Sequence, residues 1–522
     1  MKNPKSQQAS FIDVDYYCEQ LVPKNIFYRK FREKLHGLII DEMFSELYCG
    51  NNGRPPISPS LLAKAMLIQY HMNLSDRELE RACMFDIEVK FALGLRIDER
   101  PFDHSSLGDF RDRLLKSGKE KEIFDQILKQ LIDDKLISKE EVQRVDATHV
   151  LADIAIPNMV GMVKKASFEI LKLLNKNNSE IEKEVLRNIS AEEYTSIKIN
   201  DDGAGRFDLN KRAECLVKYV NEAQYILKST DHLKEDARYK EPIEVLRTIL
   251  RENIETTEDG EPREIDSAKK PTNRIVSPID VDARAGAKSK IKKFIGYKTS
   301  ISQEIKNRFI TNVDVMAGNI NDGKATVKLF EELKRSLDIV PVKVIGDSAY
   351  GDGIIRQQMS DLGCQIVSPF KDKNPRTKAV LPKSDFKIDR TNNTLTCPRG
   401  VIAKPHFYDS AKSSMNFHFP MSACNRCDLQ SKCTKAKEGR RTVRIYDWQG
   451  LIMESETYNR TDEFKNDMKL RQAIEGKFAE MKRLHGMTRT RYRGLKKVRL
   501  QCAFTAAIVN LKRWINIEYA AI

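Results

Sequence analysis

Residues 342–353 read Val342-Lys343-Val344-Ile345-Gly346-Asp347-Ser348-Ala349-Tyr350-Gly351-Asp352-Gly353. The β-branched run from Val340 to Ile345 predicts a strand, and a helix is expected from about Ile354 to Leu362. Asp347 therefore follows the carboxyl end of a strand, which is where ligand sites gather in α/β sheets. It is a candidate catalytic or metal-binding residue; the alternative is a turn or helix cap.

A second acid, Asp146, lies in the middle of a strand predicted from Val142 to Val150. Further strands are predicted at 291–300, 309–317 and 365–368, and an amphipathic helix at 322–337. The resulting order is three strands, helix, strand, helix, strand. This order is the one expected of a ribonuclease-H-like α/β domain.

Residues 152–270 interrupt this order after the first strand. They are charged, and helices are predicted at 166–186, 209–227 and 242–254, followed by a polar loop at 255–270. We interpret them as an inserted helical subdomain, since a connection this long is not an ordinary loop. The alternative is a separate domain, with the strands divided between different sheets.

The composition is that of a large, basic, globular chain. It has 522 residues, a hydrophobic content of 40%, a formal net charge of +15 and a pI of about 9.1. A chain this basic is expected to meet a polyanion, with nucleic acid as the first candidate; the alternative is charge that only serves solubility. No apolar run is long enough to cross a bilayer, and Met1 to Ser10 has no apolar core of a signal peptide.

The N-terminal part, from about Lys24 to Lys135, predicts short helices. Ser58-Pro59 opens one after a break at residues 53–56, and Ser75 with Glu78 forms a capping box at the start of the next. A third is expected from Asp86 to Leu93, and a fourth from about Ser105. Short helices joined by tight turns are typical of a helix-turn-helix DNA reader; the alternative is a helical docking domain.

A third acid belongs to the C-terminal part. A continuous helix is predicted from Phe464 to Leu484, and it places Arg471, Glu475 and Lys482 on one face. The alternative is a surface ion pair between Glu475 and Arg471. Glu480 is a further acid, but it lies on a different face.

The segment from Lys482 to Arg499 contains many cations and no acid. Such a run fits contact with DNA phosphates, and the alternative is a solvated basic face. Its candidate DNA-binding residues, beside Arg471 and Lys482, are Arg489, Arg491, Arg493, Lys496 and Lys497. The closing helix, 500–515, is apolar and is expected to pack on the core.

Four of the ten cysteines cluster, namely Cys397, Cys424, Cys427 and Cys433. Four thiolates that include a Cys-x₂-Cys pair fit a structural Zn²⁺ site, with His406 and His418 as substitute ligands. The alternatives are four ordinary reduced cysteines, or an iron–sulfur cluster.

Taken together, these blocks resemble the DDE transposases of bacterial insertion sequences, whose catalytic domain is ribonuclease-H-like. The resemblance implies that Asp146, Asp347 and Glu475 form the acidic triad. It also implies two Mg²⁺ or Mn²⁺ ions held by these carboxylates, a chemistry that suits oxygen ligands. Arg471 and Lys482 correspond to the basic residues around the last acid, with a role in gripping the DNA backbone. Met468 stands where the family has a tyrosine.

The resemblance also implies a division of the chain and a function. The expected parts are an N-terminal helical DNA-binding domain (1–138), a ribonuclease-H-like core (139–151 and 271–370), a helical insertion (152–270), a Cys-rich insertion (371–463) and C-terminal helices that complete the core (464–522). The expected activity is cleavage and strand transfer at the ends of the protein's own element, on double-stranded DNA, as a homo-oligomer and in the bacterial cytoplasm at the nucleoid. The alternatives are a metal-dependent endonuclease of the same fold and a DNA-binding protein without catalysis.

Overall fold

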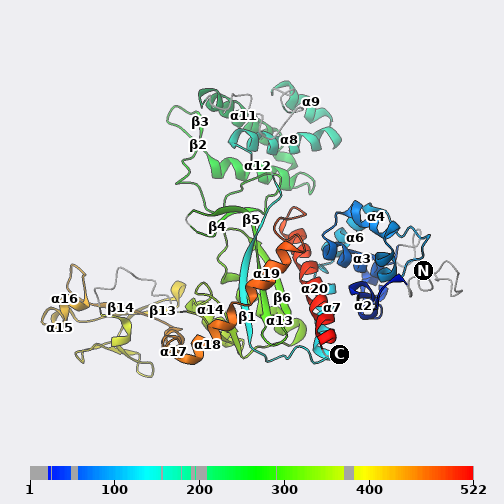
Figure 1. Ribbon diagram of the computed structural model, residues 1–522. Coiled ribbons are helices and arrows are strands. Elements are labelled where there is room, and N and C mark those ends of the chain that lie inside the picture. Colours follow the sequence, from blue (N-terminus) through cyan, green and yellow to red (C-terminus); the bar gives the residue numbers. More distant parts are fainter. Residues whose placement is uncertain are drawn as a thin grey trace.

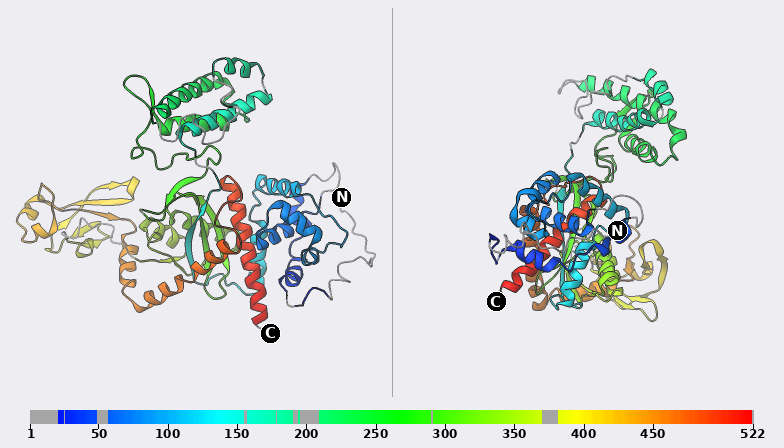
Figure 2. Two further views of the ribbon diagram at one scale, coloured as in Figure 1. Left: turned by 45° about the horizontal axis from the view of Figure 1, so that its top comes forward. Right: turned by 90° about the vertical axis from the view of Figure 1, so that its right-hand side faces the viewer.

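A computed structural model describes residues 21–24, 26–48, 57–154, 157–177, 179–189, 194, 209–289, 291–369 and 381–520. The protein is mixed α/β, and its elements surround one central six-stranded sheet. In Figure 1 the N-terminal helices lie on one side of this sheet, a helical part lies beyond one end of it, and a part with small sheets extends from the other side. Figure 2 shows the helical part projecting from the sheet in both further views. No helix within the described ranges is long and apolar enough to cross a membrane.

The central sheet has the strand order β6-β5-β1-β7-β8, with β4 as a further partner of β5. β5 runs antiparallel to β1, β4 and β6, whereas β1, β7 and β8 are parallel. The register places Ile345 opposite Arg144, so Asp146 and Asp347 each follow this pair by two residues on neighbouring strands. The strands are β1 (Gln143–Leu151), β4 (Arg284–Ala287), β5 (Lys293–Glu304), β6 (Ile310–Ala317), β7 (Lys343–Ile345) and β8 (Gln365–Val367).

The sequence predicted these strands with the exception of β4, and it predicted the two helices between them. Helix α13 (Lys324–Leu337) packs on β6, and α14 (Gly353–Asp361) packs on β8. α14 begins where Asp352 accepts a hydrogen bond from the N–H of Ile354, an N-cap that stabilises the first turn.

Helix α20 (Leu495–Ala520) joins the sheet to the N-terminal helices. It contacts β6 on one side and α3 and α7 on the other, and almost every residue from Val498 to Leu511 is buried. A helix that is apolar all round is typical of a buried position. One continuous hydrophobic cluster therefore contains the N-terminal helices, α20 and the sheet.

The N-terminal helices begin and end at the predicted caps. The side chain of Ser58 accepts a hydrogen bond from Leu61, both bonds of the Ser75–Glu78 capping box are present, and Gly94 ends α5 at φ +65°. The predicted break at 53–56 lies outside the described residues. The helices are α2 (Phe27–Leu35), α3 (Pro59–Met72), α4 (Asp76–Phe85), α5 (Ile87–Leu93), α6 (His104–Lys116) and α7 (Glu122–Asp133).

The predicted insertion has a hydrophobic cluster of its own. The helix predicted at 166–186 corresponds to α8 and α9, and residue 178 between them lies outside the described residues. The prediction of a plain loop at 255–270 is wrong, because this segment contains a small hairpin of β2 (Ile254–Thr256) and β3 (Pro262–Glu264), in which Arg263 pairs with Glu255 across the strands. The helices are α8 (Met159–Asn177), α9 (Ser179–Arg187), α11 (Leu209–Ser229) and α12 (Lys240–Asn253).

The Cys-rich segment forms two three-stranded antiparallel sheets around a third, smaller hydrophobic cluster. Its strands were not predicted, because each has only two to five residues. They are β9 (Lys387–Asp389), β10 (Thr394–Thr396), β11 (Ile402–Ala403), β12 (Pro405–Asp409), β13 (Ser414–His418) and β14 (Thr442–Tyr446), with helices α15 (Met421–Asn425) and α16 (Gln430–Cys433), and α17 (Gln449–Tyr458) follows.

The continuous helix predicted at 464–484 is wrong. Two helices, α18 (Asp462–Arg471) and α19 (Ile474–Arg483), are separated by a turn at residues 472–473. The buried guanidinium of Arg144 donates a hydrogen bond of 2.6 Å to the carbonyl of Leu470 and another of 2.7 Å to Gln303. The Leu470 carbonyl is the one that an unbroken helix would offer to Ile474, so a side chain from β1 competes with the helical bond at the break.

Replacing Arg144 by Leu removes both hydrogen bonds. We expect the free energy of unfolding to fall by about 2 kcal/mol, the size typical of bonds from a charged donor, and the amides of 468–476 to exchange faster. Chemical unfolding and hydrogen–deuterium exchange measure these effects. Replacing the exposed Arg335 by Leu is the control, and exchange at 468–476 that matches this control would contradict the role given to Arg144.

Candidate active site

Asp146 and Arg471 form the centre of the candidate site. Asp146 lies in β1, opposite Ile301 of β5, and its side chain is 18% exposed. The Arg471 guanidinium, at the last residue of α18, contacts the Asp146 carboxylate at 3.2 Å. The N–H of Ala147 donates to the other carboxylate oxygen at 2.8 Å. One carboxylate of the predicted triad is thus joined to one of the predicted basic residues.

The electrostatic setting of Asp146 is unfavourable for its charged form. Burial, and to a lesser extent the nearby carboxylates of Asp347 and Asp322, raise the pKa of this carboxyl from 3.8 to about 6 against the lowering effects of Ala147 and Arg471. Acids brought together at a partly buried place are destabilised by desolvation and by mutual repulsion. Perturbed carboxyls of this kind are typical of functional sites.

Asp347 occupies the loop that follows β7, as predicted. Its carboxylate accepts the N–H of Ala349 at 2.7 Å, and its carbonyl accepts the hydroxyl of Ser368 at 2.6 Å. Gly346 is required next to it, since a Cβ there would lie 2.9 Å from the Tyr350 side chain. The loop is therefore fixed by the bonds on both sides of Asp347.

Two residues beside the acids, Asp322 and Tyr350, were not predicted from the sequence. Asp322 raises the pKa of both Asp146 and Tyr350, and it pairs with Lys298 at 2.7 Å. Gly323 lets its turn approach the Asp347 loop, because a Cβ there would lie 2.5 Å from the carbonyl of Ala349. In the sequence, Asp322 stands at the start of a predicted helix, where an acid is an ordinary capping residue.

The Tyr350 side chain is fully buried beside the acids. Burial raises its pKa well above 10, and Asp146, Asp322 and Asp347 add to this effect. Its hydroxyl has no hydrogen-bond partner among the described residues. The position of Tyr350 three residues after Asp347 was the available signal, but a tyrosine in a turn has no specific meaning by itself.

Glu475, the third predicted acid, follows the break between α18 and α19. It is exposed, in the first turn of α19, four residues after Arg471, and α18 and α19 both contact β1. Among the described residues, the only three metal-ligating side chains with donor atoms within 4.8 Å of one another are Glu80, Asp103 and His104. The donor atoms of Asp146, Asp347 and Glu475 therefore do not all lie within 4.8 Å of one another.

A cationic surface borders the site. Lys482 of α19 is half-buried, and burial and the nearby Lys288 lower its pKa. Burial lowers the pKa of His149 on β1, and Lys482 and Lys288 lower it further. His149 is three residues beyond Asp146 on β1, so the cationic groups lie about 10 Å farther along this strand than the acids, at roughly 3.3 Å per residue.

The remaining candidate DNA-binding residues have different surroundings. Arg491 donates to the carbonyl of Leu74 and to Asn73, which ties the C-terminal segment to the N-terminal helices. Lys497 pairs with Asp112 at 3.1 Å, and Arg489 lies 3.7 Å from Asp153. Arg493 and Lys496 are exposed. Arg491 is thus engaged within the protein, whereas the others reach solvent.

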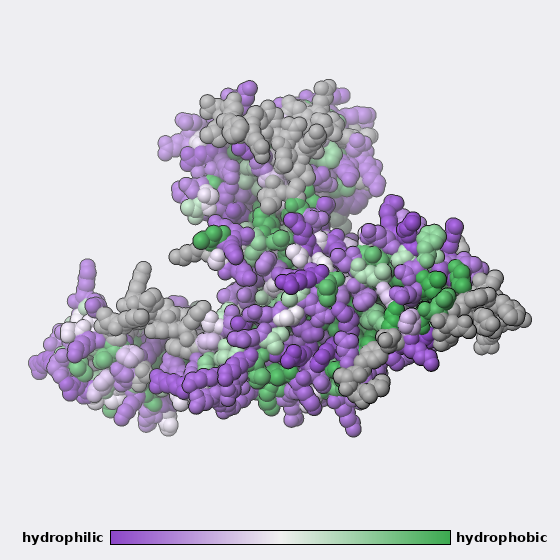
Figure 3. Space-filling model, in the orientation of Figure 1, coloured by the Kyte–Doolittle hydropathy of each residue, from purple (hydrophilic) through white to green (hydrophobic). Residues whose placement is uncertain are grey.

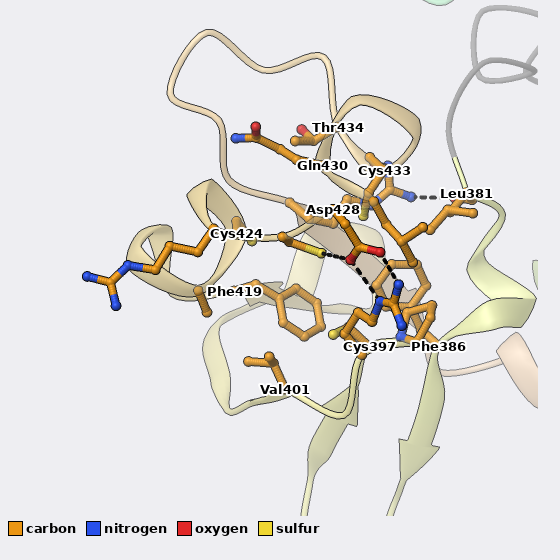
Figure 4. A pocket seen from close by; sticks show the side chains of 17 residues that line it. Leu381, Phe386, Cys397, Val401, Phe419, Cys424, Asp428, Gln430, Cys433 and Thr434 are labelled. Atoms are coloured by element: carbon orange, nitrogen blue, oxygen red, sulfur yellow. Dashed lines mark hydrogen bonds and ion pairs between the residues drawn. The ribbon is translucent and has the colours of Figure 1, made fainter.

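The four clustered cysteines line one cavity of about 290 Å³ (Figure 4). They are free thiols, and burial and the three neighbouring thiols raise the pKa of Cys433 against the effect of Arg441. Cys424 and Cys427 are joined by a backbone hydrogen bond of 3.1 Å, and Cys397 begins a tight turn that closes at Gly400. His406 and His418 stack on each other at 4.2 Å and do not line this cavity.

Comparisons with known proteins identify two segments. Residues 396–515 match the family model described as transposase DDE domain, and residues 16–113 match the transposase domain DUF772. The first match includes Glu475 and the four cysteines, and the second includes the helices from α2 to most of α6. No curated protein and no solved structure matches the chain. The two matches support its identification as an insertion-sequence DDE transposase, and such a domain implies DNA-cleaving or DNA-transferring activity and the use of divalent metal ions.

The raised pKa of Asp146 predicts a pH-dependent effect of its removal. An aspartate in the unfolded chain ionises near pH 4, while the folded protein holds the proton up to about pH 6. The contribution of Asp146 to the stability of the wild type therefore falls between about pH 4 and pH 6, by up to about 3 kcal/mol, and is level above that. The asparagine side chain of the Asp146→Asn variant cannot ionise, so the variant does not lose this stability as the pH rises.

We expect the melting temperature of Asp146→Asn, relative to the wild type, to rise from pH 4.5 to pH 7.5 when both are measured without divalent metal. Thermal unfolding monitored by circular dichroism gives the two curves. Asp338→Asn is the control, because Asp338 is an exposed acid that follows the last residue of α13, at the helix end away from Asp322. Parallel curves for Asp146→Asn and the wild type would contradict the assignment.

Proposed function

We propose that the protein binds the ends of its own insertion sequence, cleaves the DNA there and joins the freed ends to a target, with Asp146, Asp347 and Glu475 as the catalytic acids. The observation that carries the proposal is the convergence of Asp146 within β1, Asp347 just after the parallel strand β7, and Arg471 at the end of α18. The net charge of +15 and the match to a transposase DDE domain add support.

The strand order supports a ribonuclease-H-like catalytic core. Three antiparallel strands are followed by two parallel ones, in the spatial order β6-β5-β1-β7-β8, with α13 and α14 between the later strands. This is the arrangement expected from the sequence, and it puts the first acid in the middle strand and the second at the end of its parallel neighbour. The separate hydrophobic clusters support the helical and Cys-rich parts as insertions into this core.

The donor chemistry of the site fits Mg²⁺ or Mn²⁺, because all three proposed ligands are carboxylates. Two such ions would activate the attacking hydroxyl or water and stabilise the leaving oxygen of the phosphodiester. Repulsion between Asp146 and Asp347, which raises the pKa of Asp146, is relieved by a cation. Glu475 would complete the set from α19, whose neighbour α18 is held at β1 by Arg144 and Arg471.

The basic residues have distinct proposed roles. Arg471 neutralises Asp146 and holds it in place, and in the complex it turns to the DNA backbone near the scissile phosphate. Lys482, Arg489, Arg493, Lys496 and Lys497 contact phosphates farther along the duplex. Arg491 acts indirectly, since its bonds to Asn73 and Leu74 fix the N-terminal DNA-binding helices to the catalytic part. Because two ends must be cut together, the active form is a homo-oligomer on DNA.

The test is a cleavage and strand-transfer assay with labelled duplexes from the DNA that borders the coding sequence, a supercoiled target and Mg²⁺. We expect Glu475→Gln to lower the cleavage rate by at least about a thousandfold while end binding persists, because one of three metal-binding carboxylates is lost. Glu480→Gln is the matched control on the same helix, since the Glu480 carboxylate already forms ion pairs with Lys477 and Lys512.

The outcomes separate the functional classes. Joined products that are lost in Glu475→Gln support the transposase. Cleavage without joining favours a metal-dependent endonuclease of the same fold. Binding that EDTA does not affect, without cleavage, favours a DNA-binding protein in which the acids are structural.

For the cysteine cavity we propose a structural Zn²⁺ held by Cys397, Cys424, Cys427 and Cys433. Four thiols around one cavity, two of them in a Cys-x₂-Cys turn, are the donor set that zinc prefers. Cys397 lies between β10 and β11, and the other three lie in and between α15 and α16, so a shared ion would join these segments.

We expect the purified protein to contain about one zinc ion per chain, and Cys424→Ser/Cys427→Ser to lose it. Elemental analysis after dialysis measures the content. His406→Ala should retain the metal, because His406 stacks on His418 outside the cavity. Zinc that persists in the double cysteine variant would place the ion elsewhere, and visible charge-transfer absorption would indicate an iron–sulfur cluster instead.

A further inference from the structure

The hairpin of β4 and β5 extends the strand that borders the candidate active site. The strands pair antiparallel, with Ala287 opposite Lys293, and β5 then continues beside β1 until Ile301 lies opposite Asp146. The hairpin stands at the end of the sheet nearest the helical insertion (Figure 1). Residues 288, 289, 291 and 292 are the described part of its tip.

The base of the hairpin is held rigidly. A Cβ on Gly286 would lie 2.5 Å from the ring of Phe294 and 2.3 Å from the carbonyl of Gly318, so only glycine allows this packing. The ring of His149 lies 5.1 Å from that of Phe294, measured between centroids. The hairpin is therefore fixed to β1 and to the end of β6.

The tip is ordered by its own hydrogen bonds. The N–H of Lys288 donates to the carbonyl of Lys292 at 2.8 Å. The hydroxyl of Ser289 accepts the N–H groups of Lys292 and Ile291, at 3.0 and 3.3 Å. Such a serine turn fixes the backbone locally, so the tip presents its side chains in a defined arrangement.

An apolar side chain stands at the centre of this tip. Ile291 is 91% exposed, the highest value among the large apolar side chains of the described residues, and apolar surface is visible at the end of the hairpin in Figure 3. Single exposed apolar residues are common. Here, however, Ile291 is surrounded by Lys288, Lys292 and Lys293, which are exposed and form no ion pair within the described part of the chain.

The lysines of the tip continue the cationic surface beside the site. Lys288 lies close enough to Lys482 and His149 to influence both. From Ile301, opposite Asp146, to Ile291 the chain advances by ten residues, or about 32 Å at roughly 3.2 Å per residue. This corresponds to roughly nine base pairs of B-form DNA, slightly less than one helical turn.

We propose that the tip of the β4–β5 hairpin binds and distorts duplex DNA about nine base pairs from the scissile bond, with Lys288, Lys292 and Lys293 on phosphates and the Ile291 side chain wedged against the bases. A two-stranded ribbon fits a DNA groove, and apolar wedges flanked by cations unstack base steps. The lysines favour DNA over a second protein copy as the occupant. The proposal rests on the proposed DNA-transposition function and specifies how DNA is held at the catalytic part.

The test uses the full-length protein, Ca²⁺ in place of Mg²⁺ to prevent cleavage, and a duplex of about 40 base pairs, four helical turns, from the element end. Permanganate reactivity of thymines reports unstacking along this duplex. We expect a reactive position about nine base pairs from the cleavage site in the wild type, and reactivity at the level of free DNA in Ile291→Ala. Val342→Ala, a half-exposed apolar residue at the opposite end of the sheet, is the control and should retain the signal.

The lysines are tested by the salt dependence of binding. Lys288→Gln and Lys292→Gln should each lower the slope of log Kd against log salt concentration by about 0.9, the value for one lost phosphate contact, while Ile291→Ala and the distant Lys334→Gln leave the slope unchanged.

Reactivity that persists in Ile291→Ala overturns the wedge, and slopes unchanged in both lysine variants overturn the phosphate contacts. A change of oligomeric state in Ile291→Ala without DNA would assign the tip to a protein contact instead. If the wild type binds the duplex in Ca²⁺ and cleaves it in Mg²⁺, but the variants behave like the wild type, only the hairpin proposal fails. A wild type that neither binds nor cleaves overturns the proposed function as well.

Discussion

Strand β1 carries the constraint on which the other site residues depend. It pairs antiparallel with β5 and parallel with β7, and the parallel register brings Asp347 beside Asp146 although two hundred residues of chain separate them. The same strand supplies Arg144, whose guanidinium reaches Leu470 and so determines where α18 ends. Arg471 then meets Asp146 from that helix end. A single strand thus positions the first acid, aligns the second and anchors the helix that precedes the third.

The grouping of carboxylates destabilises the folded protein, and the same repulsion favours the binding of a cation. Asp146, Asp322 and Asp347 are close enough to influence one another, and the buried hydroxyl of Tyr350 among them has no described partner. One guanidinium offsets part of the repulsion at Asp146, as its pKa of about 6 indicates. Carboxylates gathered against their own repulsion form a site that gains stability when a cation arrives, which links folding energy to the proposed metal chemistry.

The sequence predicted the elements of the sheet well because their signals are local. β-branched runs identify β1, β6 and β7, and the caps at Ser58, Ser75 and Gly94 identify the first helices. It failed where distant groups decide the outcome. The break between α18 and α19 depends on Arg144, which lies more than three hundred residues earlier, and the short strands around the cysteines depend on a small core that their own sequences hardly reveal.

The residues of the candidate site divide in the same way, between those with a local signal in the sequence and those that depend on packing. Asp146, Asp347 and Glu475 are predicted from their positions and from the resemblance. Asp322 and Tyr350 were not predicted, because their closeness to the acids arises only from packing: Gly323 against Ala349, and the Tyr350 ring against Gly346. The predicted stripe of Arg471, Glu475 and Lys482 on one helix face does not hold across the break, and Arg471 faces β1 through its own helix end.

The shared core of the N-terminal helices and the sheet has a mechanical consequence. α20 contacts β6, α3 and α7, while Arg491 bonds to Asn73 and Leu74 and His485 bonds to the carbonyl of Tyr70 at 2.9 Å. Elements packed this way form one body, so the helices proposed to read DNA and the acids proposed to cut it keep a fixed separation. The helical and Cys-rich parts have their own hydrophobic clusters instead. A fixed separation between recognition and chemistry would place cleavage at a constant distance from the recognised sequence, which is what excision of a defined element requires.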